Sequence, residues 1–160
     1  MQRLGNWAPP RWVRLWMHSA SRCGDGWLWF ALAPLILYYG GNERLKALAA
    51  PAAAVLTGIA TFLLMKRLTG RERPRAIAPF SWSRMMPPDR FSFPSGHSIT
   101  AFAVTVPISM FYPSAMLGLL FCAASVAASR IVLGLHFVSD VVVGSAMGAG
   151  IGYAAYSLIA

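Results

Sequence analysis

Three short clusters of polar residues stand out in a sequence that is otherwise mostly apolar. The last cluster places Arg130, His136 and Asp140 in one apolar stretch. If His136 begins a helix, Asp140 lies one turn further on the same face, and an imidazole held by a carboxylate presents its other nitrogen as a base or nucleophile. Ionisable groups are costly in a membrane segment, so their presence indicates chemistry. The alternative is an Arg–Asp pair that holds two helices together.

The middle cluster is Pro94-Ser95-Gly96-His97, which directly precedes an apolar run. At the N-terminus of a helix, the amides of Ser95, Gly96 and His97 would favour an anion through unpaired N–H groups and the helix dipole. Gly96 would let the backbone approach that anion closely. The alternative is that Ser95 only caps the helix and His97 faces water among the headgroups.

The first cluster is a basic run over residues 66–75, directly after a long apolar segment. Its ordinary interpretation is a membrane anchor that meets lipid phosphates. Lys66, however, lies at the end of the apolar segment and Arg73 further along the loop, so both cations can reach one anion. Two such cations beside a membrane suit a phosphate group carried by a lipid.

Apolar segments recur along the chain and must position these clusters. The chain has 160 residues, of which 57% are hydrophobic and 12% charged, and its mean hydropathy is +0.55. This composition is too apolar for a soluble globular domain. We expect an all-α polytopic membrane bundle of about five transmembrane helices. The expected helices are residues 27–39, 45–65, 99–112, 115–129 and 141–160.

The segment before the first of these helices has a different character. Residues 1–22 interleave tryptophans with arginines, which is typical of an amphipathic helix in the membrane interface. A disordered basic tail is the alternative, because Pro9-Pro10 limits a helix. We expect a single membrane-embedded domain over residues 1–160, with this interfacial segment first and a core over residues 45–160.

Together the clusters resemble the signature of the type 2 phosphatidic acid phosphatase superfamily, integral membrane lipid phosphatases that share an active-site pattern with vanadium haloperoxidases. That signature is a lysine, six residues and Arg-Pro; then Pro-Ser-Gly-His; then Ser-Arg, five residues, His, three residues and Asp. All three elements occur in this order and with this spacing, as Lys66 with Arg73-Pro74, residues 94–97, and Ser129-Arg130 with His136 and Asp140.

The resemblance implies a role for each matched residue. His136 would attack phosphorus and form a phosphohistidine, Asp140 would hold the tautomer of His136, and His97 would protonate the departing oxygen. The phosphate would be bound by Lys66, Arg73, Arg130, Ser95 and Gly96. No metal or other cofactor is expected, because three cations and a helix terminus can stabilise the charge that phosphoryl transfer develops.

The sequence therefore predicts a metal-independent hydrolase of lipid phosphates or pyrophosphates. Candidate substrates are polyprenyl phosphate derivatives, phosphatidate and phosphatidylglycerol phosphate. Two alternatives stay open, a nonhydrolytic phosphate- or lipid-binding protein or transporter subunit, and a lipid phosphotransferase of the same fold. The enzyme is favoured because binding alone needs no pair such as His136 and Asp140. The net charge of +9 on so apolar a chain indicates anionic lipid rather than nucleic acid as partner.

Some further features have weaker implications. Gly144, Gly148 and Gly152 recur every four residues, which favours close helix packing and allows a homo-oligomer contact. Residues 76–92 form either a lid or an anchored surface connection. His18, Glu43 and Asp89 receive no chemical role.

The charge distribution bears on orientation in the membrane. With five spans, all three clusters share one side, which carries twelve of the fourteen Lys and Arg residues. The positive-inside rule then favours a cytoplasmic site in a bacterial-type inner membrane. The resemblance points the other way, because bacterial members that recycle polyprenyl pyrophosphates generally face the periplasm.

Overall fold

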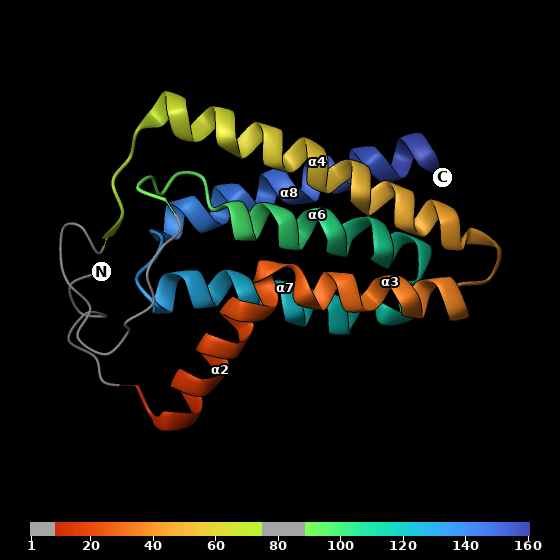
Figure 1. Cartoon of the computed structure of the whole chain (residues 1–160), viewed down its shortest axis with the longest axis horizontal. Helices are drawn as coiled ribbons and strands as arrows, with labels where there is room; N and C mark the ends of the chain where they lie inside the picture. Colours follow the sequence, from red (N-terminus) through yellow and green to blue (C-terminus); the bar gives the residue numbers. More distant parts are fainter. Residues whose placement is uncertain (1–8, 75–88) are drawn as a thin grey trace.

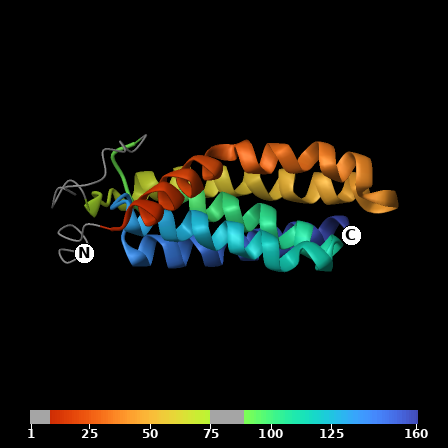
Figure 2. The ribbon, with the colours of Figure 1, turned by 90° about the horizontal axis from the view of Figure 1, so that it is seen from below.

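The computed structural model describes residues 9–74 and 89–160, and the regular elements within them are all helical. The main helices α3 (Leu28–Tyr39), α4 (Arg44–Thr69), α6 (Gly96–Phe111), α7 (Met116–Val132) and α8 (Val138–Ile159) run side by side as one bundle (Figures 1 and 2). The predicted all-α bundle is confirmed, and each of its five helices overlaps one of the expected segments. Residues 1–8 and 75–88, the latter including most of the expected lid over residues 76–92, lie outside the described residues.

Three helices in the described part of the chain are long and apolar enough to cross a membrane. They cover Gly41–Thr69, Pro113–Val132 and Val138–Ile159. Helix α6 has 16 residues and α3 has 12, so at about 1.5 Å per residue both are shorter than the ~30 Å hydrocarbon core. Helix α3 is preceded directly by the turn η1 (Cys23–Trp27), in which the chain is kinked at Gly26.

Helix α6 lies at the centre of the bundle, in contact with α4, α7 and α8. Ten of its 16 residues are buried, and most of them are small, such as Ala101, Ala103 and Ser109. Small side chains let three neighbouring helices approach one axis, as is usual inside lipid. The first turn of α6, with the middle polar cluster, is therefore enclosed by the other elements at the same end.

The glycine stripe of α8 faces α6 within the same chain. Gly144, Gly148 and Gly152 are all buried. A Cβ atom at Gly148 would lie 2.3 Å from the carbonyl oxygen of Ile99, and one at Gly144 would lie 2.8 Å from that of Ser95. The stripe thus serves packing inside the bundle, and the homo-oligomer contact considered for it is wrong, since α6 already covers these positions.

Helix α2 (Arg11–Arg22) leaves the bundle at an angle and packs on α7 (Figure 1). Trp12 is exposed, whereas Met17 is buried against Leu133 and Leu135. An exposed aromatic side with arginines suits the membrane interface. The buried side brings α2 against the end of the bundle that carries the polar clusters.

We expect Gly148→Ala to destabilise the protein, because the new methyl group must push α8 away from the Ile99 carbonyl. Overpacking of this kind costs about 1–3 kcal/mol. The melting temperature in detergent should fall accordingly. Gly150→Ala on the same helix is the matched control, since nothing lies within 4 Å of its Cβ position. Equal melting temperatures for the two variants would contradict the packing described here.

Candidate functional site

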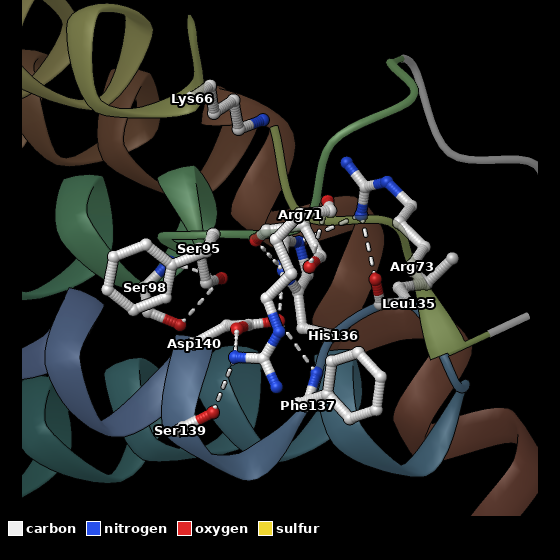
Figure 3. Close-up of polar contacts among 12 residues, drawn as sticks. Lys66, Arg71, Arg73, Ser95, Ser98, Leu135, His136, Phe137, Ser139 and Asp140 are labelled. Atoms are coloured by element: carbon white, nitrogen blue, oxygen red, sulfur yellow. Dashed lines mark hydrogen bonds and ion pairs between the residues drawn. The ribbon is translucent and has the colours of Figure 1, made fainter. Parts of the chain in front are cut away.

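The three polar clusters meet at one end of the bundle. Lys66 lies in the last turns of α4, Arg73 follows that helix, and His136 precedes α8. Figure 3 shows Lys66, Arg73 and Asp140 arranged around His136. One cavity of about 690 Å³ is lined by six of the predicted site residues: Lys66, Arg73, Gly96, His97, Arg130 and His136.

His136 is buried and its hydrogen bonds define its tautomer. Its Nδ1 lies 2.7 Å from the carbonyl oxygen of Ser92, which can only accept, so Nδ1 carries the proton. Its Nε2 lies 3.0 Å from Nη1 of Arg73, a donor, so Nε2 carries the lone pair. Burial, with Arg73 and Arg130 nearby, lowers the pKa of His136 to about 4. At neutral pH the ring is therefore uncharged, with Nε2 available as a nucleophile.

Asp140 is fully buried beside His136, but Nδ1 of the ring donates its hydrogen bond to the Ser92 carbonyl oxygen and not to this carboxylate. One carboxylate oxygen of Asp140 accepts from the amide of Phe137 at 2.8 Å, and the other accepts from Arg71 at 2.8 Å. The distance from Asp140 Oδ2 to His136 Nδ1 is 3.6 Å. Because the first turn of α8 and Arg71 engage this carboxylate, the Ser92 carbonyl accepts the Nδ1 proton. Asp140 acts on the ring through its charge.

Arg71 and Ser92 are site residues that the sequence reasoning missed. Arg71 donates to Ser139 Oγ at 2.9 Å as well as to Asp140, and its guanidinium lies 4.3 Å from the centre of the Phe137 ring (Figure 3). The position of Arg71 in the sequence, two residues before Arg73, is the feature that could have identified it. Ser92 acts through a backbone oxygen, which has no signature in the sequence.

Asp89 joins the two cations of the first cluster, which corrects the expectation that it has no role. Its Oδ2 accepts from Lys66 at 2.6 Å and its Oδ1 accepts from Arg73 at 2.9 Å. Burial raises the pKa of the Asp89 carboxyl, but hydrogen bonds from Lys66 and Arg73 outweigh burial and the pKa lies below its ordinary value. Asp89 is therefore an anion at neutral pH, and its two oxygens take positions suited to two oxygens of a phosphate.

The N-terminus of α6 gives different roles to two adjacent residues. Ser95 is the N-cap, since its Oγ accepts from the amide of Ser98 at 3.4 Å, and its own amide donates to the Asp140 carbonyl at 3.1 Å. Ser95 is buried behind the cavity, whereas Gly96 lines it. Of these two predicted phosphate ligands, Gly96 is the one placed to meet a bound anion directly.

Arg130 and His97 are held by the N-terminal part of the chain. Arg130 is buried, and its Nη1 donates to Ser21 Oγ on α2. Among the described residues its Nε finds no hydrogen-bond partner. His97 Nε2 lies 2.7 Å from Oδ1 of Asp25. A buried guanidinium N–H without a partner at a cavity wall suits an anionic ligand.

The cavity continues away from the polar residues between α3, α4 and α6. Along α4 it reaches from Lys66 to Leu48, which is about 27 Å at 1.5 Å per residue. This length is close to that of a bilayer core. The wall here is apolar and is formed by Trp29, Phe30, Leu32, Ile36, Val55, Leu56, Ile59, Phe62, Val104 and Ile108 among others. A ligand with a charged head and a long apolar chain matches this shape.

Comparison with known proteins points in one direction. The sequence pattern of the PAP2 superfamily matches residues 46–160. The chain is 37% identical over 139 residues to decaprenylphosphoryl-5-phosphoribose phosphatase of Mycobacterium tuberculosis, covering 84% of this chain and 72% of that protein. It is 28% identical over 145 residues to lipid A 1-phosphatase of Rhizobium johnstonii, covering 76% of this chain and 58% of that protein.

Two crystal structures share the fold over 98% of this chain. For LpxE from Aquifex aeolicus the TM-score is 0.79 at 23% identity, with 92% of that chain covered. For the transmembrane PAP2 type phosphatidylglycerolphosphate phosphatase from Bacillus subtilis the TM-score is 0.73 at 22% identity, with 81% covered. At these identities the likeness concerns the fold.

We expect Asp89→Asn to strengthen the binding of inorganic phosphate, because it removes a negative charge from the two cations that would receive the anion. Asp89 is partly exposed, so solvent screening limits the gain to about threefold to tenfold. The measurement is the inhibition constant of phosphate during hydrolysis of p-nitrophenyl phosphate. Glu72→Gln, which removes an exposed carboxylate paired with Arg90, is the matched control. Unchanged or weaker inhibition in Asp89→Asn would contradict competition between carboxylate and phosphate.

Proposed function

Because this chain belongs to the PAP2 superfamily, we propose that it is a multi-pass membrane phosphatase that hydrolyses a lipid phosphate or pyrophosphate through a phosphohistidine on His136. The observation that carries the proposal is the uncharged His136 ring, with its Nε2 lone pair beside Arg73 in a cavity that is cationic at one end and apolar along its length. The named relatives are phosphatases of decaprenylphosphoryl-5-phosphoribose and of lipid A.

In the first half-reaction the phosphate group displaces the Asp89 carboxylate from Lys66 and Arg73. Arg130 contributes its Nε–H to a nonbridging oxygen. His136 Nε2 then forms a bond to phosphorus as the bond from phosphorus to the lipid oxygen breaks. His97 gives its proton to that oxygen, and three cations stabilise the charge on the transferred group.

In the second half-reaction water replaces the lipid alcohol. His97, now neutral, takes a proton from the water as its oxygen attacks phosphorus, and the bond from phosphorus to His136 breaks. Inorganic phosphate leaves, His97 is protonated again, and Asp89 can return to the two cations.

The shape of the cavity supports a lipid rather than a soluble phosphate as substrate. A lipid chain that extends about 27 Å from the cations would lie along the apolar wall of the cavity between α3 and α4. Polyprenyl phosphate derivatives, phosphatidate and phosphatidylglycerol phosphate all have this form. A binding protein or transporter subunit has no need of a neutral nucleophile set among cations, and a phosphotransferase would differ only by using an alcohol in place of water.

We expect His136→Ala to abolish release of inorganic phosphate from lipid and aryl phosphates alike, because no phosphohistidine can form. His97→Ala should lose about 10²–10⁴ in rate on a lipid phosphate but much less on p-nitrophenyl phosphate, whose leaving group needs no proton. Both substrates are assayed in detergent, and the wild-type intermediate is trapped as an acid-labile, base-stable phosphoprotein. A fully active His136→Ala would overturn the assignment, and labelled lipid alcohol acceptors would reveal a phosphotransferase.

We further propose that the site faces the cytoplasm of a bacterial-type inner membrane. This rests on the positive-inside rule, because the end of the bundle with the site carries most of the basic residues.

The orientation is checked by cysteine labelling after replacement of Cys23 and Cys122. Glu72 is exposed at the end of the bundle with the site, and Asn42 is exposed in the turn at the opposite end. In right-side-out membrane vesicles, an impermeant maleimide should label Asn42→Cys and spare Glu72→Cys. The reverse pattern would place the site on the periplasmic side.

A further inference from the structure

A carboxylate from outside the three clusters contacts one of the two histidines at the cavity. Asp25 Oδ1 lies 2.7 Å from His97 Nε2, and both residues line the cavity. Asp25 belongs to η1, the turn that joins α2 to α3. It therefore precedes residues 46–160, the part that matches the family pattern. The site uses a residue that this pattern does not contain.

The backbone around Asp25 is shaped for this contact. Gly26 has a φ of 116°, which side-chain-bearing residues rarely adopt, so the chain bends sharply at this position between α2 and α3. A Cβ atom at Gly24 would lie 2.7 Å from Cγ1 of Val126 and 3.3 Å from Cδ2 of His97. The two glycines thus let the turn bend and approach α6 and α7 closely enough for Asp25 to reach His97.

The charged groups around His97 affect how readily its ring carries a proton. Burial, together with the positive charges of Arg130 on α7 and Lys66 on α4, lowers the pKa of His97 to about 4, and the hydrogen bond and charge of Asp25 oppose this shift. Asp25 on η1 is the carboxylate in hydrogen-bond contact with the ring. A general acid must carry its proton until the leaving oxygen takes it. Between two cations, this requires an anion in contact with the ring.

We propose that Asp25 is a positioning residue for His97, which orients the imidazole and stabilises its protonated form for donation to the leaving oxygen. The inference rests on the proposed phosphatase function, since it assigns a partner to its general acid. Asp25 remains a carboxylate throughout: the proton passes from His97 to the lipid oxygen, and His97 regains one from the attacking water. Ser21, four residues before Asp25, binds Arg130, so the same segment supports a cation of the site.

The test compares Asp25→Asn with the wild type on two substrates. Hydrolysis of a lipid phosphate, whose alkoxide leaving group needs a proton, should slow by about 10-fold to 100-fold. Hydrolysis of p-nitrophenyl phosphate should slow by less than about threefold, because its leaving group departs unprotonated. The alkaline limb of the pH profile for the lipid substrate should move to lower pH, since the protonated ring has lost its anion. Asp25→Glu should restore part of the rate.

A double variant and a control separate this role from a structural one. In the His97→Ala background, Asp25→Asn should cause no further loss on the lipid substrate, because the group it serves is gone. Glu43 lies in the turn between α3 and α4, and its exposed carboxylate pairs with Lys46. As a control, Glu43→Gln should leave both rates unchanged.

Three outcomes would overturn the inference. They are equal losses on both substrates, an unshifted pH profile, and full additivity with His97→Ala. If the wild-type protein hydrolyses lipid phosphates and Asp25→Asn does so at the same rate, only the role of Asp25 is refuted. A wild type that releases no phosphate from any lipid would instead refute the proposed function.

Discussion

One backbone hydrogen bond joins the middle and last polar clusters. The amide of Ser95, at the start of α6, donates to the carbonyl oxygen of Asp140, in the first turn of α8, at 3.1 Å. The two helices come this close only because Gly144 has no side chain, since a Cβ atom there would lie 2.8 Å from the Ser95 carbonyl. This contact holds the two helices so that His97 and His136 line the same cavity. The distance between an entering and a leaving group in phosphoryl transfer is thus fixed by helix packing inside the bundle.

Most of the few acidic residues in the chain lie next to the charged or catalytic side chains of this site. The chain has only five Asp and Glu residues, and three of them, Asp25, Asp89 and Asp140, contact predicted site residues. The three carboxylates act differently, since the first faces a histidine, the second bridges two cations and the third lies behind the nucleophile. Buried charges are tolerated when they are paired and hydrogen-bonded, so the acids offset part of the repulsion among the cations around this cavity.

Spacing along the sequence predicted the five bundle helices and the cluster residues, because apolar runs and motif intervals are local properties. The contacts of Asp89 and Asp25 were not predictable in this way. Asp89 meets Lys66 and Arg73 only after Gly70 turns the chain with a φ of 56° and Glu72 pairs with Phe91. Asp25 lies 72 positions from His97, and no motif links the two.

Asp89 also limits how tightly the resting site can hold the bulk lipid of a membrane. A bilayer presents an excess of phosphodiester headgroups, each with one negative charge, beside rare phosphomonoesters that carry nearly two. A cradle of bare cations would bind either kind and would be saturated by the bulk lipid. With a carboxylate already bound to Lys66 and Arg73, an incoming headgroup must exchange with an anion of unit charge. Because this internal anion must leave first, it weakens the binding of every headgroup by the same factor and so lowers occupation of the site by the abundant phosphodiesters. The preference for a monoester comes from its higher charge against the two cations.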